Sequence, residues 1–504
     1  MNKLLVAGNR SVLKFLLPSL LQAIPEPLTI VITDDCSSSQ TEIDEEMNEM
    51  LYGKQSDGRI TIIKKDEMTW RELVQPFHLV LLASANNNLE LYHEFYSCCI
   101  EEQKVLLPLT FTHEYGILGP TTIKETDACW ESCWLRLHVQ NRMPTSPAPT
   151  IVDRMSHITS SYVERYLSTG IPELQNSVYI LSEDPIHGEI HSFFEHPLTL
   201  QHIPLSDWFP LHIPFNQEQS SMNEEQLQNY FTGLVSSRTG VFYSLEESSF
   251  EQLPLSLCSI QIADPLSDGP ATRLPATIHA GMDHTQARRE AGLSGLERYM
   301  SRLCDHLLLD KMQNTYVGAG TTGSEAAGRG LQSLLQSELD RLYRWDMQQA
   351  TPVVVPFDLS KLDDLCSKYY LESLRALAED LVLGYSEDLY PHIPIVWVRS
   401  NGTWYYAIDL NPTLALRRVL TEALGHIQTG HKRSDSISFK NISLSGQTKQ
   451  MCLPEAGTSY HPKDIEDLLS VLHPFQVLVT KLAVEPFLKE LVVYGVRLSK
   501  EVFK

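Results

Sequence analysis

Short apolar segments alternate with helices through the first 111 residues, and this alternation constrains the fold more than any other feature of the sequence. Five segments have the length and apolar character of strands that are buried on both faces. Between them, residues 11–23 and 89–103 read as helices. Strands that are joined through helices pair in parallel, so the sequence predicts an α/β unit around a mainly parallel sheet. The predicted strands cover residues 3–8, 28–35, 60–64, 78–83 and 105–111.

The first strand–helix–strand unit has the layout of a nucleotide-binding fold but lacks its glycine loop. The second strand ends on Asp34 and Asp35, where a nucleotide-binding α/β unit places an acid. Gly8 stands alone where G-x-G-x-x-G is expected, and a lone glycine can end a strand in any α/β fold. A nucleotide site and a plain strand end both remain open, and the missing glycines favour the strand end.

Length and charge narrow the function classes. A chain of 504 residues is too long for one core and predicts two or three domains. Its hydrophobic content of 42% is typical of a globular protein. The net charge of −23 argues against nucleic acid as a partner, because binding phosphates requires a basic surface.

The sequence shows no sign of a membrane or secreted protein. No segment has the length and apolar purity of a membrane helix. The first apolar stretch is interrupted by Asn9, Arg10 and Lys14 and lacks a signal-peptide cleavage site. Nine scattered cysteines, an odd number, are typical of reduced thiols. We therefore expect a cytoplasmic protein.

Residues 279–346 hold two helix-like segments of the same layout, each beginning at a glycine turn. In the first, the spacing i, i+4, i+7 places Glu290, Ser294 and Glu297 on one helical face. Acids that face inward need a metal, an arginine or another cation opposite them, whereas acids on an outer face are simply solvated. The spacing leaves both interpretations open.

The second segment begins with Thr322-x-x-Glu325, which fits a capping box. Free N–H groups at the preceding turn, Gly318 to Gly323, could instead hold a phosphate. A structural cap is the commoner outcome of such a pattern.

These blocks resemble the YcaO family, ATP-dependent enzymes that cyclise backbone amides in ribosomally made peptides. Residues 290–298, with the pattern E-x-x-x-S-x-x-E-R, are similar to the first family signature. The glycine turn with Glu325 and Ala326 is similar to the second, although its acidic run is replaced by Ser333, Gln336 and Ser337. The run ALRRVLTEALG at 415–425 is similar to the third, with Glu422 kept and Gly425 in place of a glutamine.

The resemblance implies a site for ATP and Mg²⁺ at the three blocks. Of the seven positions that matter most there, only Glu297 and Glu422 keep the expected group, so we expect most of the carboxylate cage to be lost. No catalytic residue is assigned. The candidate cofactor-binding residues are Glu290, Glu297, Arg298 and Glu422.

Residues 116–137 are similar to a signature of the ubiquitin-activating-enzyme-like proteins that accompany YcaO enzymes. The matching residues include Arg136, Cys129 and Cys133, and the C-x-x-x-C spacing puts both thiols on one helical face. A structural zinc needs two more ligands, and the region where relatives carry them has no cysteine. We expect buried packing thiols and no zinc. The only substitutes are His191, His196 and His202.

The resemblance covers nearly the whole chain and implies an α/β, Rossmann-like, ubiquitin-activating-enzyme-like domain followed by a YcaO-like α+β domain. A polar run before residue 229 predicts domains at 1–215 and 229–504, with a linker at 216–228. We expect the first domain to lack the winged-helix unit of its relatives. The second is expected to be truncated, because the family carries a longer insert between positions 298 and 318.

This arrangement resembles the cyclodehydratases that make thiazole- and oxazole-containing bacteriocins and thiopeptides. The interpretation that we favour is a scaffold or partner subunit with a degenerate ATP site. Its partners would be a precursor peptide and a complete YcaO enzyme or a leader-binding protein, and a homodimer is expected by analogy alone. The alternative is an active ATP-dependent enzyme that converts Cys, Ser or Thr to azolines. A third, an adenylating enzyme using Asp34 or Asp35, is disfavoured by the lone Gly8.

Overall fold

A computed structural model describes most of the chain, and it divides into two compact units. Unit 1 comprises Met1–Gln201 with Arg238–Gly240 and Ser267–Thr272, and unit 2 comprises the remainder. None of the helices in the described part of the chain is both long and apolar enough to cross a bilayer. The described residues are 4–33, 59–63, 68–85, 88–112, 114–124, 129–139, 147–182, 187–199, 207–211, 222–247, 250–307, 314–346, 352–389, 392–430, 442–457 and 460–499.

Unit 1 is built on one eight-stranded sheet with the strand order β3-β2-β1-β4-β5-β6-β7-β8. The first five of these pair in parallel, as predicted, and β6, β7 and β8 extend the sheet with antiparallel pairs that the apolar pattern did not predict. The sheet is therefore mixed. The strands are β1 (Leu4–Gly8), β2 (Leu28–Ile32), β3 (Ile60–Ile63), β4 (Leu79–Ser84), β5 (Val105–Phe111), β6 (Tyr115–Leu118), β7 (Ser177–Ser182) and β8 (His187–Ser192).

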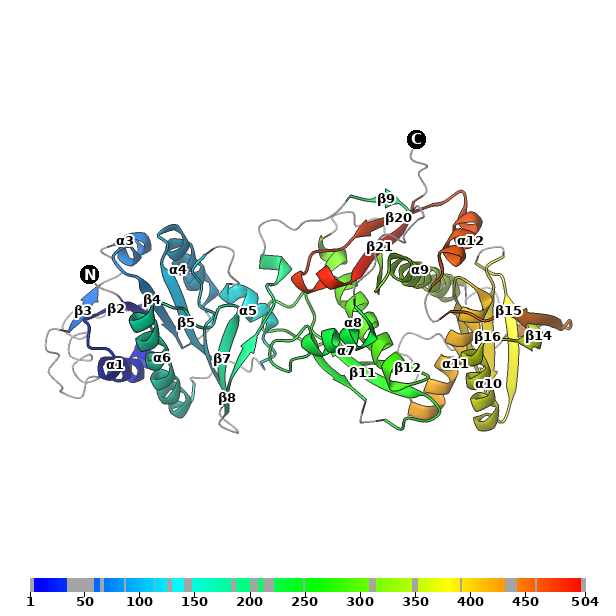
Figure 1. The fold of residues 1–504 in the computed structure, drawn as a ribbon, viewed down its shortest axis with the longest axis horizontal. Helices are drawn as coiled ribbons and strands as arrows, with labels where there is room; N and C mark the ends of the chain where they lie inside the picture. The colour runs from blue at the N-terminus through cyan, green and yellow to red at the C-terminus, as the bar shows by residue number, and fades with distance from the viewer. Residues whose placement is uncertain are drawn as a thin grey trace. The chain divides into compact units, whose positions relative to one another are not determined.

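Helices cover both faces of this sheet, as parallel strands require. Figure 1 shows α1 and α6 on one face and α3 and α4 on the other, and the two faces bury separate apolar cores. Helix α6 begins at Pro149, because a proline fits the first turn of a helix. The helices are α1 (Arg10–Ala23), α3 (Trp70–Val74), α4 (Leu89–Glu101), α5 (Trp130–Arg136) and α6 (Pro149–Thr169).

Unit 2 contains three further sheets, with the orders β10-β11-β12, β13-β21-β20-β9 and β17-β16-β15-β14-β18. Strand β19 pairs with β14 beside β18. The strands are β9 (Phe209–Pro210), β10 (Phe242–Glu246), β11 (Ser256–Ile262), β12 (Thr277–Gly281), β13 (Tyr316–Gly320), β14 (Val353–Leu362), β15 (Leu381–Ser386), β16 (Ile395–Ser400), β17 (Thr403–Ile408), β18 (Ser443–Leu444), β19 (Lys449–Leu453), β20 (Gln476–Lys481) and β21 (Val492–Ser499).

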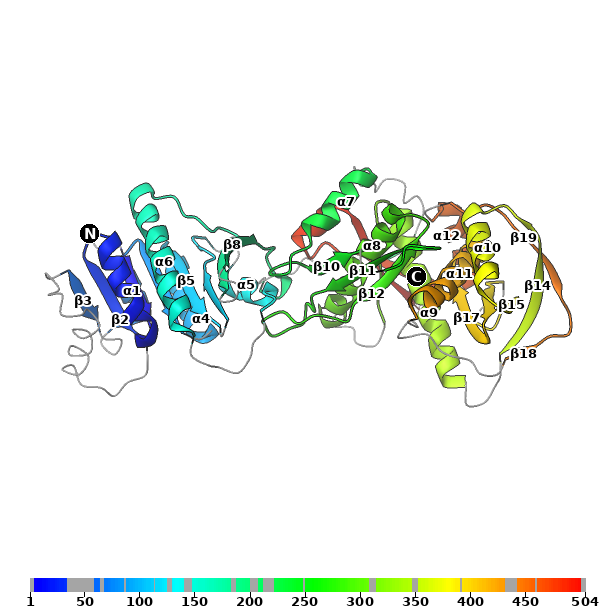
Figure 2. The ribbon, with the colours of Figure 1, turned by 90° about the horizontal axis from the view of Figure 1, so that it is seen from below.

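The helices of unit 2 pack between and over these sheets. One face of the β14–β17 sheet packs against α10 and α11, which Figure 2 shows side by side, and the other face packs against α9. Helix α8 lies on β11 and β12 and also contacts β13. The helices are α7 (Glu224–Gly233), α8 (His284–Leu307), α9 (Gly323–Asp346), α10 (Leu365–Leu377), α11 (Pro412–Thr429) and α12 (Pro462–Leu472).

Short sequence patterns, such as turn dipeptides and helix caps, account for where several of these elements begin or end. The β16–β17 hairpin turns at Asn401 and Gly402, both with positive φ, as the Asn-Gly pair predicts. Asn411 caps α11 by accepting from the Leu414 N–H. Residues 224–228, predicted as the end of a linker, instead begin α7, where Asn223 and Gln226 form a capping box. The domain limits at 215 and 229 remain a prediction.

Candidate functional site

The acidic face predicted on α8 meets an arginine from α9. Arg329 Nε donates to Glu297 Oε1 at 2.5 Å, and Nη2 donates to Glu297 Oε2 at 3.0 Å. Its Nη1 donates to Glu290 Oε2 at 2.8 Å, and Nη2 also reaches Ser294 Oγ at 3.2 Å. All three residues of the predicted face therefore contact one guanidinium. We call Glu290, Ser294, Glu297 and Arg329 the clamp.

Glycines bring the helices of the clamp close to their neighbours. A Cβ on Gly330 would lie 2.5 Å from Val496 of β21, and one on Gly318 would lie 2.0 Å from the Ala326 carbonyl oxygen. Helix α9 can therefore lie directly against β13 and β21 at the turn that carries Arg329. On α8, a Cβ on Gly295 would lie 2.3 Å from Ile260, so this helix also packs tightly on its sheet.

Burial and charge make the clamp a strong ion pair. The side chains of Arg329, Glu297 and Glu290 are 12%, 15% and 35% exposed. Burial alone would lower the pKa of Arg329, but the charges of Glu290 and Glu297 outweigh it and raise that pKa well above its usual value. Burial would likewise raise the pKa of Glu290, but the charge of Arg329 prevails and lowers it. Both partners are therefore charged at neutral pH.

Carboxylates also accept from backbone N–H groups before α9, where the predicted glycine turn is in the structure the end of β13, up to Gly320, and a short turn after it. The Ala319 N–H donates to Glu297 Oε1 at 3.0 Å, and the Thr321 N–H donates to Glu325 Oε2 at 2.8 Å. The Glu325 N–H is bound by Thr322 Oγ1 at 3.1 Å, which is half of the predicted capping box. Glu325 is buried and pairs with Arg289 of α8 at 2.8 Å. This turn therefore binds acids of its own chain.

The other two predicted site residues, Arg298 and Glu422, are not among the residues that bind Arg329. Arg298 Nη1 donates to the Pro275 carbonyl at 2.6 Å. Glu422 is half-buried on α11, near Tyr405. Burial, with the charge of Glu422 adding to it, raises the pKa of Tyr405 to about 12. Only the family resemblance had suggested that Arg298 and Glu422 share a cofactor site with Glu290 and Glu297.

Sequence reasoning missed Arg329. It lies four residues after Glu325, on the helix face that turns toward α8, and between two glycines. A lone arginine in a run of small residues on a buried helix was the available signal, because such a side chain needs an acid opposite it.

Two arginines of α11 form further ion pairs beside the clamp. Arg417 Nη2 bonds to Asp364, the N-cap residue of α10, at 2.6 Å. Arg418 Nε bonds to the buried Asp409 at 3.1 Å, and its Nη2 donates to the Tyr460 hydroxyl at 3.2 Å. Both arginines are thus matched by acids of the same unit.

A Mg²⁺–nucleotide complex, which the resemblance implies here, does not fit these residues. Mg²⁺ takes carboxylate oxygens as ligands, but both Glu297 oxygens accept from N–H donors. A phosphate needs free N–H groups, but those of Ala319 and Thr321 face carboxylates. Within the described ranges, no group of three or more His, Cys, Asp or Glu side chains is arranged to hold a metal ion.

Unit 1 holds the two cysteines of the other signature in a packing role. Cys133 is buried, and burial raises its pKa well above the usual value. Cys129 caps α5 by accepting from the Ser132 N–H, and burial raises its pKa as well. Arg136 is buried and donates to the carbonyls of Phe194 and Glu195. These groups support the fold of α5. Of the histidines considered for zinc, His202 lies outside the described residues.

The strand end after β1 is closed by backbone packing. A Cβ on Gly8 would lie 2.4 Å from the Ala83 carbonyl oxygen of β4, which explains the lone glycine. Asn9 Oδ1 accepts from the Ala85 N–H at 2.8 Å and ties the ends of β1 and β4 together. Asp34 and Asp35, predicted as candidate nucleotide ligands, lie outside the described residues.

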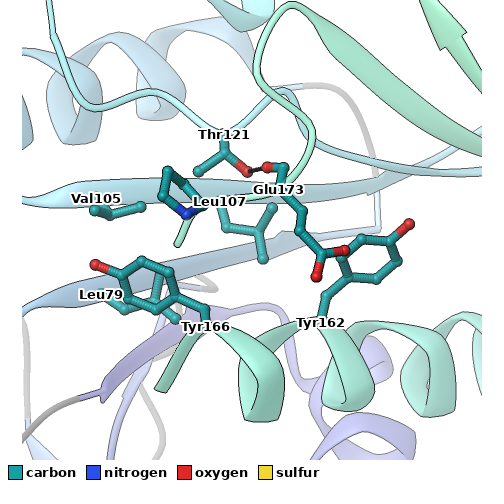
Figure 3. A pocket seen from close by; sticks show the side chains of 8 residues that line it. Leu79, Val105, Leu107, Thr121, Tyr162, Tyr166 and Glu173 are labelled. Carbon is teal, nitrogen blue, oxygen red and sulfur yellow. Dashed lines mark hydrogen bonds between the residues drawn. The ribbon is translucent and has the colours of Figure 1, made fainter. Parts of the chain in front are cut away.

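A small cavity lies elsewhere in unit 1, between α6 and the strands β4 and β5. Figure 3 shows Tyr162 and Tyr166 of α6 facing Leu79, Val105 and Leu107 across it. Its volume is about 10 Å³, the space of one water molecule. It is too small for a nucleotide or a peptide side chain.

Comparison with known proteins gives a fold but no family. No protein-family model and no curated protein sequence matches the chain. A heterocyclase solved in complex with substrate and cofactor is similar in structure, with a TM-score of 0.60 and 15% identity over 95% of this chain and 81% of that one. The heterocyclase TruD is similar with a TM-score of 0.53 and 13% identity over 100% of this chain and 80% of that one. The chain therefore shares the mixed α/β fold of heterocyclases.

Proposed function

We propose that this protein is a component of a complex that forms azoline heterocycles in a ribosomal precursor peptide. The support is the heterocyclase-like fold, which extends over nearly the whole chain, together with the three signature-like blocks of unit 2. Within such a complex the protein serves as a scaffold or partner subunit. Its partners are the precursor peptide and a complete YcaO enzyme or a leader-binding protein.

The observation that carries this role is the Arg329 guanidinium between Glu290 and Glu297. Forming an azoline with ATP requires a phosphoryl group to be transferred to an amide oxygen, and Mg²⁺ and fixed cations stabilise that transfer. In this chain the acids that would hold Mg²⁺ are neutralised by an internal arginine. A subunit of this kind can bind a peptide and a partner, while the complete enzyme performs the chemistry.

Reconstitution tests the proposal. This protein, a complete YcaO enzyme, or both together are mixed with ATP and the precursor peptide of that enzyme, and ring formation is followed by mass spectrometry as loss of water. We expect no rings from this protein alone and faster ring formation when both proteins are present.

Two results would contradict the proposal. Ring formation by this protein alone would establish the alternative, an active ATP-dependent cyclodehydratase with a diverged site. No binding to either the peptide or the enzyme would remove the protein from such a complex.

A further inference from the structure

The clamp and the turn before α9 form one continuous network of opposite charges. Glu297 joins the two, because its Oε1 accepts both from Arg329 Nε and from the Ala319 N–H. Glu325 continues the network from the Thr321 N–H to Arg289. Cations and anions thus alternate over a site at which the family resemblance implies a metal and a nucleotide.

The positive part of the network resembles a bound cation in its contacts. Arg329 reaches oxygens of three α8 residues, including both oxygens of Glu297, and its side chain is almost buried. A divalent ion at the same place would need those oxygens as ligands and would lie against a fixed positive charge. Arg329 and a divalent cation therefore exclude each other.

The negative part resembles a bound phosphate. The N–H groups of a glycine turn that leads into a helix commonly bind phosphate oxygens. Here carboxylate oxygens accept from the Ala319 and Thr321 N–H groups at 3.0 and 2.8 Å, which are ordinary distances for such bonds. A phosphate would meet the negative charges of Glu297 and Glu325 at this turn.

We propose that the chain supplies, from its own side chains, substitutes for both parts of a metal–nucleotide complex. Arg329 replaces the divalent cation, and the carboxylates of Glu297 and Glu325 replace the phosphate oxygens at the turn. The charges that a bound ligand would compensate are compensated internally, so unit 2 folds without ligand. This inference rests on the proposed function only for its choice of the expected ligand.

The cation part is tested by removing the guanidinium and supplying Mn²⁺. In Arg329→Met, Glu290 and Glu297 lose their counter-charge, and millimolar Mn²⁺ should raise the melting temperature of the variant by roughly 2–4 °C. Wild type and Arg329→Lys, which keeps the positive charge, should not respond. Arg341→Met, which removes an exposed arginine of the same helix, is the matched control and should also not respond.

The anion part is tested with pyrophosphate. In Glu325→Ala the Thr321 N–H loses its carboxylate and Arg289 keeps only its pair with Glu224, so pyrophosphate should stabilise this variant and not the wild type. Glu338→Ala, which removes an acid farther along α9, is the control.

Either part can overturn the proposal. A folded Arg329→Met variant without a Mn²⁺-dependent shift, or a folded Glu325→Ala variant without a pyrophosphate-dependent shift, contradicts it. Should a variant fail to fold, direct titration of the wild type with Mn²⁺ decides, since binding contradicts the proposal and its absence supports it. None of these readouts uses a peptide, so a failure here is distinguishable from failed ring formation.

Discussion

The sequence indicated one possible nucleotide site in each unit, and the described residues at these two places are held by different kinds of interaction. In unit 1, at the ends of β1 and β4, neutral groups take up the space. Gly8 touches the β4 backbone, and Asn9 bridges to the Ala85 N–H. In unit 2, between α8 and α9, charged side chains take up the space, because Arg329 is bound to Glu290 and Glu297.

The difference predicts how each place responds to change. The closure of unit 1 depends on volume, so adding atoms should disturb it while ions should not. The closure of unit 2 depends on charge balance in a partly buried setting, so removing one partner leaves an uncompensated charge. The following predictions test this contrast, beginning with the largest expected effect.

Arg329→Met should destabilise unit 2 by about 3–5 kcal/mol, because it leaves two partly buried carboxylates without their cation. Hydrogen exchange of peptides from α8 and α9, compared with peptides from unit 1, measures the loss where it occurs. Equal exchange in both units, or no change relative to Arg341→Met, would show that the clamp does not stabilise unit 2.

Gly8→Ala should destabilise unit 1 by about 1–3 kcal/mol, because the new methyl group overlaps the Ala83 carbonyl oxygen. Exchange of the β1 and β4 amides reports the effect, and Mn²⁺ should not alter it. Gly425→Ala on α11 is the control, since a methyl group at that position would meet no described atom within 4 Å. A Gly8→Ala protein as stable as the control would refute the steric account.

Acidification should open unit 1 before unit 2. Burial, assisted by Arg136, lowers the pKa of His196 well below 6.5, so below pH 6.5 the unfolded chain takes up a proton that the folded chain does not. Unit 1 then loses up to about 1.4 kcal/mol per pH unit. The lowered pKa of Glu290 gives unit 2 the same sign of dependence, but only below about pH 4.5.

Hydrogen exchange across pH 4–7, corrected for the intrinsic rate, checks this order. His196→Gln should remove the part of the unit 1 response that begins near neutral pH. If unit 2 opened at the higher pH, the assignment of these two groups would be wrong.

Breaking a surface ion pair should have the smallest effect on stability, and the effect should be similar in both units. Arg165→Ala in unit 1 breaks a pair with Glu173, and Arg302→Ala in unit 2 breaks one with Asp264. Both arginines are exposed, so each change should cost less than about 1 kcal/mol. Chemical denaturation measures both variants side by side. A loss from Arg302→Ala as large as that from Arg329→Met would show that burial is not the cause of the difference.

Features with local signals were predictable from the sequence. The Asn401-Gly402 hairpin and helix α12, from Pro462 to Leu472, follow from turn chemistry and helix starts within a few residues. The strands β1 to β5 follow from their apolar runs, which need no knowledge of their partners. The antiparallel extension β6–β8 depends on pairing between distant segments, and no single segment encodes it.

The candidate site also has one part that local sequence predicts and one part that depends on distant segments. Helical spacing predicts that Glu290, Ser294 and Glu297 share a face, and the clamp confirms it. Their partner lies on another helix, and which helix faces which is a tertiary property. Spacing therefore left both a cation partner and a solvated face open, and it could not identify Arg329.

Calorimetric titration of the wild-type protein with Mg-ATP tests the central claim most directly. We expect no binding up to millimolar nucleotide. Arg329 already pairs with Glu290 and Glu297, and the carboxylates of Glu297 and Glu325 already accept from the Ala319 and Thr321 N–H groups. Micromolar binding that is lost on replacing Glu297 and Glu422 by alanine would contradict this expectation and identify a working nucleotide site.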